Sequence, residues 1–138
     1  MKNLITYQGA VMTWECDSNR HMNVMFYINK FEHAGRQFDL HMGLGEIGGE
    51  TDTGTVVLEQ NIKYLKEVFE DDLLYVKSSL ESIGNKAFTI FHQMHLSKTH
   101  ELVSTMRIVL VLFDKVHRKA LPFPTDLKEK LLAELAAS

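Results

Sequence analysis

One strong helical pattern lies in residues 23–42, NVMFYINKFEHAGRQFDLHM. Apolar residues recur there at steps of three and four, which traces a single stripe along a helix. The stripe consists of Val24, Tyr27, Ile28, Phe31, Ala34, Gly35, Phe38 and Met42. Asn23 suits the N-cap, because its side-chain oxygen can accept from the free amides of the first turn. Met22 and Tyr27 have the spacing of a hydrophobic staple. Gly43 and Gly45 are typical residues for ending a helix. We therefore predict a helix over Val24 to Met42.

The segments on either side of this helix have the two-residue period of strands. Residues 5–14, Ile5 to Trp14, alternate and predict one strand before the helix. Four more strands are predicted between Thr55 and Phe113, in residues 56–64, 73–80, 88–96 and 102–113. The pair Gly84-Asn85 suits a tight hairpin. The last strand is apolar almost throughout, as expected for a central strand covered on both sides. Residues 125–137 predict a short amphipathic helix.

The order of these elements indicates an α+β domain. A single long helix covers several antiparallel strands only if the sheet curls around it. The length of 138 residues suits one domain, 1–138, with one core and no second unit.

Composition excludes several classes of function. A net charge of −3 gives no electrostatic reason to expect nucleic acid as a partner. No stretch approaches the roughly 18 consecutive apolar residues of a membrane span, and the first ten residues do not have a signal-peptide pattern. Cys16 is the single cysteine, so an intramolecular disulfide is impossible. We expect a cytoplasmic protein that binds neither membranes nor nucleic acid.

The candidate catalytic residues lie between the first predicted strand and the predicted helix. Residues 14–24, WECDSNRHMNV, resemble the signature of the 4-hydroxybenzoyl-CoA thioesterase family, in which an Asp and then Gly-His-Val-Asn precede the helix of the hotdog fold. Asp17 matches the catalytic Asp of that family, and His21 and Asn23 match its His and Asn. Arg20 stands where the family has Gly, and Glu15 where it has Asp. The likeness continues through residues 31–36, 59–64, 84–86 and 121–124.

The resemblance implies both a fold and an activity. The fold is the hotdog, a curved antiparallel five-stranded sheet wrapped around a long central helix. The activity is that of an acyl-CoA thioesterase, which hydrolyses a thioester to a free carboxylic acid and CoA. Hotdog enzymes work as homodimers or homotetramers, with the site at the subunit interface. CoA is then part of the substrate, and no separate cofactor is expected.

Elementary chemistry agrees with this assignment. The leaving thiolate of a thioester has a pKa of about 8.5, so the reaction needs mainly a nucleophile and oxyanion stabilisation. Asp17 supplies an ionised carboxylate, as nucleophile or general base. The free backbone amide of Val24 at the helix start is a candidate oxyanion donor, as the resemblance also implies. His21 and Asn23 are expected to hold the loop. Tyr27 and Tyr64 are candidates for the acyl pocket, with core packing as the alternative.

Other interpretations remain open at this level. Asp17 could be a turn residue, His21 a structural histidine and Cys16 a nucleophile, although a lone buried thiol is the commoner case. Glu32-His33 could serve a hotdog hydratase or dehydratase acting on acyl thioesters. A catalytically silent domain that binds acyl-CoA is a third possibility. The histidines are scattered, so no metal site is expected. The acyl group, the choice of CoA or acyl carrier protein, and dimer or tetramer stay undecided.

Overall fold

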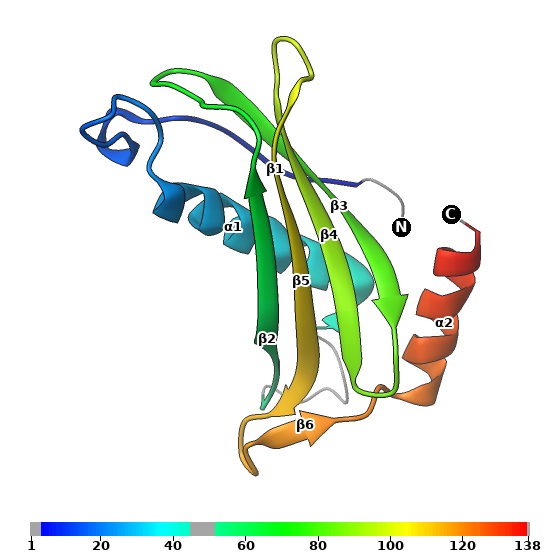
Figure 1. The fold of residues 1–138 in the computed structure, drawn as a ribbon. Helices are drawn as coiled ribbons and strands as arrows, with labels where there is room; N and C mark the ends of the chain where they lie inside the picture. The colour runs from blue at the N-terminus through cyan, green and yellow to red at the C-terminus, as the bar shows by residue number, and fades with distance from the viewer. Residues whose placement is uncertain (1–3, 45–51, 138) are drawn as a thin grey trace.

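The computed structural model describes residues 4–44 and 52–137, in which a curved sheet lies against one long helix (Figure 1). The elements are β1 (Leu4–Ala10), the 3₁₀ turn η1 (Thr13–Glu15), α1 (Val24–Met42), β2 (Thr53–Tyr64), β3 (Leu73–Ile83), β4 (Ala87–Leu96), β5 (Leu102–Asp114), β6 (Lys119–Leu121) and α2 (Thr125–Ala136). The sheet order is β1-β3-β4-β5-β2, with the short β6 also paired to β5, and every pairing is antiparallel. The predicted α+β class with a hotdog arrangement is confirmed.

Helix α1 has the bounds that the sequence predicts. The Asn23 side chain accepts a hydrogen bond from the amide of Met25, as an N-cap should. Gly43 ends the helix with a φ of 79°, a left-handed conformation that glycine adopts at little cost. Gly45 lies outside the described residues. Most of the predicted apolar stripe packs on the sheet, where α1 contacts β1 and β3, whereas Val24 and Ile28 of the stripe are exposed. Its buried apolar residues are Tyr27, Phe31, Ala34, Phe38 and Met42.

Three details of the strands differ from the sequence prediction. Strand β1 ends at Ala10 rather than Trp14, because the chain turns into η1, where the amide of Glu15 donates to the carbonyl of Met12. The β3–β4 connection has three residues, Gly84–Lys86, rather than two, and the amide of Gly84 donates to the carbonyl of Ala87. Strand β6 was not predicted, since its three residues are too few for a period to show. The predicted C-terminal helix is confirmed as α2, whose Leu131 joins the core.

Strand β5 lies inside the sheet, as its apolar sequence indicates. It pairs with β4 on one side and with β2 on the other. Its core face is buried through Met106, Ile108, Leu110 and Leu112. On the opposite face Arg107 is exposed, lying over the ring of Phe91 and bonded to both carboxylate oxygens of Glu81. In the single chain, therefore, only one face of β5 is fully covered.

A buried ion pair fastens η1 to α1. The Lys30 ammonium lies 2.7 Å from one carboxylate oxygen of Glu15, and the two residues are only 2% and 6% exposed. The other oxygen of Glu15 accepts from the amide of Met12 at 2.8 Å, and its backbone carbonyl accepts from the amide of Asn23 at 2.8 Å. The ring of Tyr7 covers the ammonium. Glu15 thus links the end of the β1 segment, the N-cap and the helix.

We predict that Lys30→Met destabilises the protein strongly, because it leaves the carboxylate of Glu15 buried without a counter-charge. The expected loss is roughly 3–5 kcal/mol in the free energy of unfolding, measured by urea denaturation. The double variant Lys30→Met/Glu15→Gln should recover most of it. The exposed pair Lys66–Glu101 has the same 2.7 Å separation and is the matched control. Lys66→Met should cost less than about 1 kcal/mol. Equal losses in the two single variants would contradict a structural role for the buried pair.

Candidate functional site

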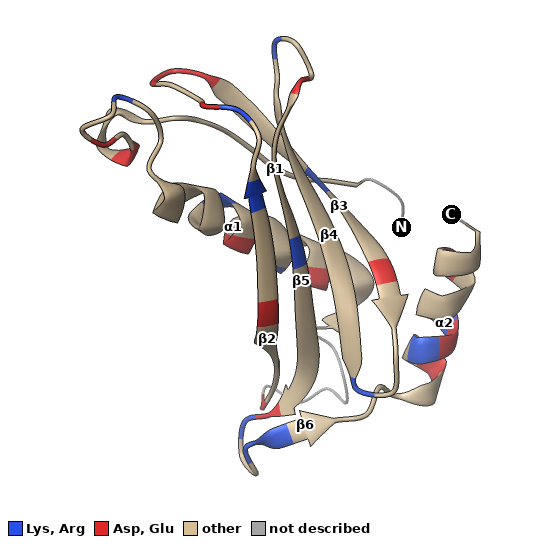
Figure 2. Cartoon of the chain, viewed as in Figure 1, with Lys and Arg blue, Asp and Glu red and all other residues tan. Residues whose placement is uncertain are grey.

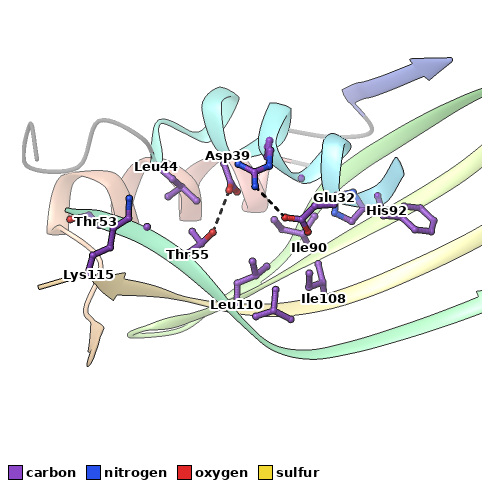
Figure 3. Close-up of a pocket in the computed structure, with 15 residues that line it drawn as sticks. Glu32, Asp39, Leu44, Thr53, Thr55, Ile90, His92, Ile108, Leu110 and Lys115 are labelled. Atoms are coloured by element: carbon purple, nitrogen blue, oxygen red, sulfur yellow. Dashed lines mark hydrogen bonds and ion pairs between the residues drawn. The ribbon is translucent and has the colours of Figure 1, made fainter. Parts of the chain in front are cut away.

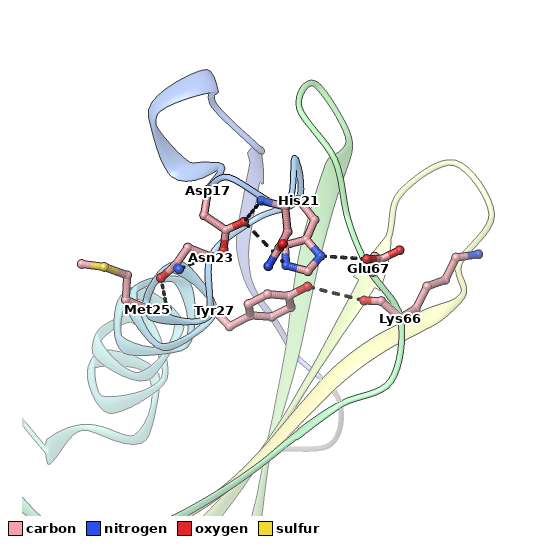
Figure 4. A network of polar contacts seen from close by, with 8 residues as sticks. Asp17, His21, Asn23, Met25, Tyr27, Lys66 and Glu67 are labelled. Carbon is pink, nitrogen blue, oxygen red and sulfur yellow. Dashed lines mark hydrogen bonds and ion pairs between the residues drawn. The ribbon is translucent and has the colours of Figure 1, made fainter.

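Asp17 lies in the loop between η1 and α1, with both carboxylate oxygens hydrogen-bonded (Figure 4). One oxygen accepts from the side-chain amide of Asn23 at 3.0 Å, and the other accepts from the backbone amide of Asn19 at 2.8 Å. The bond from Asn23 contributes most to holding the pKa of Asp17 below its usual range, followed by the bond from Asn19. The carboxylate is therefore ionised at neutral pH and is oriented by the residue that caps α1.

His21 lies between two carboxylates. Its Nδ1 is 2.8 Å from a carboxylate oxygen of Glu67, in the β2–β3 loop, and its Nε2 is 3.7 Å from the nearer oxygen of Asp17. Glu67 was not among the predicted site residues, because nothing in the sequence places the β2–β3 loop beside the motif. Figure 2 shows acidic residues on that loop, next to the loop that carries Asp17. The structure brings Asp17, His21 and Asn23 together, as the sequence predicts, and adds Glu67 to this group.

Arg20 gives the loop its sharp turn. It has a φ of 63°, so it occupies the left-handed region that a glycine at the same place would favour. Its amide donates to the carbonyl of Asp17, and the amide of Asp17 donates to the carbonyl of His21. The departure from Gly therefore leaves the turn in place, at a cost of about 1 kcal/mol in backbone strain.

The start of α1 presents a free donor beside a small cavity. The amide of Val24 has no hydrogen-bond partner among the described residues, whereas the cap satisfies the amide of Met25. The cavity has a volume of about 230 Å³. It is lined by His21, Met22, Val24, Tyr27, Tyr64, Leu65, Lys66 and Glu67. Asp17 does not line this cavity, but His21, which does, lies 3.7 Å from its carboxylate. An ionised carboxylate, an unpaired helix-start amide and a partly apolar cavity thus lie together.

Tyr27 and Tyr64 both line this cavity, in different ways. Tyr27 is buried, and its hydroxyl lies 3.4 Å from the backbone carbonyl of Lys66, to which it donates. Tyr64 is 47% exposed and meets the Tyr27 ring edge-on, with 5.1 Å between ring centroids. The core-packing interpretation therefore holds for Tyr27, which is also at the cavity wall. Tyr64 has an accessible face for a ligand.

Cys16 does not have the surroundings of a nucleophilic thiol. Burial, followed by the charges of Glu70 and Glu15, raises the pKa of Cys16. Its sulfur lies 3.9 Å from the carbonyl of Met12, a weak contact. A hydrogen bond from the backbone of Glu70 favours the thiolate, but burial and the acidic charges outweigh it.

A larger cavity lies farther along α1, between that helix and strands β2, β4 and β5 (Figure 3). Its volume is about 340 Å³. Apolar residues, among them Phe31, Ile90, Ile108 and Leu110, form much of its wall. Asp39 also lines it, and one oxygen of this carboxylate is buried with no hydrogen-bond partner among the described residues. Desolvation raises the pKa of Asp39 to about 6.

We predict that Asp39→Asn stabilises the protein at neutral pH. A raised pKa means that folding favours the protonated acid, so stability is lost as the pH rises from about 4 to about 6. Asparagine removes this cost, and the gain in free energy of unfolding should reach up to about 3 kcal/mol at pH 7 and vanish near pH 4. Thermal unfolding at the two pH values measures it. Asp126→Asn, at an exposed position of α2, is the control and should change little. A gain that is equal at both pH values would refute the explanation.

The described residues contain neither a metal-binding cluster nor a membrane-spanning helix. Within 4–44 and 52–137 no three His, Cys, Asp or Glu side chains lie close enough to hold a metal ion. In the same part of the chain, no helix has the length and apolar character needed to cross a membrane.

Comparison with solved structures places the fold among known proteins. A proposed thioesterase from Pseudomonas putida KT2440 shares 24% identity, covers 99% of this chain and 88% of its own, and has a TM-score of 0.82. Protein SAV2348 from Staphylococcus aureus, solved in complex with CoA, shares 20% identity over 99% of this chain and 87% of its own, with a TM-score of 0.83. Slr0204, a 1,4-dihydroxy-2-naphthoyl-CoA thioesterase from Synechocystis, shares 15% over 96% and 97%, with a TM-score of 0.77. No curated protein matches the chain by sequence.

The solved structures share too little sequence identity to assign a family, whereas a family model does assign one. The model of the thioesterase-like superfamily matches residues 11–131, which runs from the end of β1 into α2 and includes the whole Asp17 loop. The match confirms the predicted relationship and the predicted class of enzyme, a thioester hydrolase. The chain belongs to the thioesterase-like superfamily.

Proposed function

We propose that this protein is an acyl-CoA thioesterase, in which Asp17 attacks the thioester or activates water. One observation supports the proposal most. The start of α1 combines the ionised carboxylate of Asp17, both of whose oxygens accept hydrogen bonds, with the backbone amide of Val24, which has no partner among the described residues. A thioester carbonyl that accepts from this amide would have its developing negative charge stabilised by the helix dipole as well.

Two routes are available to the carboxylate. As a nucleophile, Asp17 bonds to the carbonyl carbon, the CoA thiolate leaves, and water hydrolyses the mixed anhydride. As a general base, Asp17 takes a proton from water, and the hydroxide bonds to the carbon while the thiolate leaves. Both end in a free acid and CoA. Asn23 holds the carboxylate in either route, and His21, itself held by Glu67, lies beside it as a further positioning group.

Support for CoA as the carrier comes from the fold and from one neighbour. The S. aureus protein SAV2348, similar over 99% of this chain, was solved with CoA. We propose the same ligand class for this chain, which we also expect to work in the cytoplasm. Tyr64 and Tyr27 would then contact the substrate at the small cavity.

The hydratase alternative receives less support from the geometry. Glu32 lines the larger cavity, where Arg36 lies 3.9 Å from it. His33 faces another way, with its ring 6.3 Å from that of Tyr7 on β1. Adjacent residues that point to different sides of a helix cannot act as one acid–base pair on one substrate.

We predict that Asp17→Asn lowers thioester hydrolysis at least ~10²-fold, because it removes the nucleophile or base and keeps the size of the side chain. Release of free thiol from a panel of acyl-CoAs measures the rate, and circular dichroism checks folding. Asp126→Asn is the matched control, since it makes the same change at an exposed position of α2. Equal rates in Asp17→Asn and native protein would remove Asp17 from its role. Absence of turnover in the native protein, with stabilisation by CoA esters, would favour a binding domain.

We propose in addition that the protein is a homodimer or homotetramer. Strand β2 is twelve residues long and lies at a sheet edge, bonded only to β5 among the described strands. Its exposed apolar residues are Val56, Val57, Leu58 and Tyr64. An exposed edge of this length and character is usually covered in stable proteins.

The expected particle mass is therefore at least twice the 15.8 kDa of the chain. Light scattering coupled to gel filtration measures it at micromolar concentration. A single peak at the chain mass would contradict the assembly.

A further inference from the structure

The side chain of Arg20 has no structural partner in the Asp17 loop. The residue is exposed, and its only hydrogen bond with a described residue runs from its backbone amide to the carbonyl of Asp17. Its φ of 63° is left-handed, a conformation that glycine adopts without strain and that has Gly in the signature this loop resembles. The backbone alone would therefore favour glycine here, and a strained residue of this kind indicates a role for its side chain.

Arg118 is a second arginine in a left-handed conformation, and its side chain has structural contacts. It has a φ of 58° in the turn between β5 and β6. Its guanidinium carbon lies 4.9 Å from the centre of the Phe113 ring, and the group donates to the carbonyl of Lys115 at 3.4 Å. These contacts explain an arginine at that turn. The guanidinium of Arg20 has no such contact and is available to a ligand.

The carboxylates of the site have partners other than Arg20. One oxygen of Asp17 accepts from Asn23 at 3.0 Å, and Glu67 has an oxygen 2.8 Å from Nδ1 of His21. Arg20 forms an ion pair with neither carboxylate. Its five N–H donors are therefore free for an anionic group of a ligand.

The two loops that flank the smaller cavity are otherwise acidic. Residues 11–23 and 65–72 contain six acidic residues and two basic ones, Arg20 and Lys66 (Figure 2). The ammonium of Lys66 lies 2.7 Å from a carboxylate oxygen of Glu101. Arg20 is thus the one basic residue of these two loops without an ion-pair partner among the described residues. An anionic group that approaches the cavity on this side would be repelled by the carboxylates and attracted by Arg20.

The distance from Val24 to Arg20 suits the phosphates that follow the pantetheine arm of CoA. Arg20 precedes Val24 by four residues, which span at most about 14 Å. The arm places about 13 bonds between the thioester sulfur and the first phosphorus, or about 15 Å at the length per bond of an extended peptide. The guanidinium can therefore contact the diphosphate while the thioester carbonyl lies at the amide of Val24.

We propose that Arg20 binds the diphosphate of CoA, and that it thereby favours CoA esters over thioesters of smaller thiols. A planar guanidinium can donate two parallel hydrogen bonds to phosphate oxygens. This inference rests on the proposed thioesterase function, because it takes CoA as the carrier and the amide of Val24 as the position of the thioester carbonyl. Arg20 is then a residue that determines specificity for the carrier and takes no part in the chemical step.

The test is binding of S-hexyl-CoA and S-hexyl-pantetheine, thioethers that cannot be hydrolysed, measured by titration calorimetry. Arg20→Gly should bind S-hexyl-CoA about fivefold to tenfold more weakly than the native protein, because charge-assisted hydrogen bonds at an exposed position are lost. S-hexyl-pantetheine has no phosphate and should bind equally to both. The analogue that lacks only the 3′-phosphate should show the same loss as S-hexyl-CoA. Arg20→Gly should fold, because glycine suits a φ of 63°.

Arg118→Gly is the matched control, because it also removes an arginine from an exposed, left-handed position and changes the net charge equally. It should bind S-hexyl-CoA as the native protein does. Arg20→Asn keeps a residue that tolerates the left-handed conformation and should lose as much affinity as Arg20→Gly. Arg20→Lys keeps the charge and should retain part of the affinity.

Equal binding of S-hexyl-CoA by the native protein and Arg20→Gly would overturn the inference, as would no binding by the native protein. The same holds for a loss that is equal with S-hexyl-pantetheine or that also appears in Arg118→Gly. Thiol release from acyl-CoAs is measured separately. Hydrolysis combined with equal binding would leave the proposed function standing and remove this inference. Binding that depends on Arg20, without hydrolysis, would leave Arg20 as a ligand of CoA and remove the proposed catalysis.

Discussion

The position of the Asp17 loop depends on the buried ion pair between Lys30 and Glu15. Two charges withdrawn from water are tolerated only when their hydrogen bonds are satisfied, and here Glu15 uses both oxygens, on Lys30 and on the amide of Met12. The same residue accepts from the amide of Asn23, which in turn holds Asp17. A short series of polar contacts therefore connects Lys30, in the buried face of α1, to the carboxylate of Asp17. Displacement of the pair would move the helix cap and Asp17 together.

Much of the fold could be predicted because its signals are local. The three- and four-residue spacing from Val24 to Met42, with Asn23 before it and Gly43 after it, defines α1 without help from the rest of the chain. The end of β1 could not be found this way, since residues 11–14 continue to alternate while Glu15 bends the backbone toward Lys30. One signal was present: Lys30 lies on the side of the helix that carries Tyr27 and Phe31, and a lysine there requires a buried partner.

In the candidate site, too, the features that depend on neighbouring residues could be predicted, and those that depend on distant residues could not. Asp17, His21 and Asn23 lie within seven residues, so their meeting depends on one turn and could be inferred from the motif. Glu67 and the larger cavity arise from strand pairing over long sequence separations, which periodicity does not reveal. Likewise the buried contacts that join His92 to Ser78, and Ser78 to Thr6, link residues on three different strands. The residues of the Asp17 loop could therefore be predicted from the sequence, whereas the residues that surround this loop and line the cavities could not.

We propose that the thioester carbonyl docks on the free backbone amide of Val24, facing Asp17. A crystal structure of the protein with a non-hydrolysable acyl-CoA analogue that retains the carbonyl tests it most directly. We expect the carbonyl oxygen at about 2.9 Å from the amide nitrogen of Val24, with its carbon turned toward the carboxylate of Asp17. An analogue bound with its carbonyl away from Val24, and with other residues around the thioester, would contradict it.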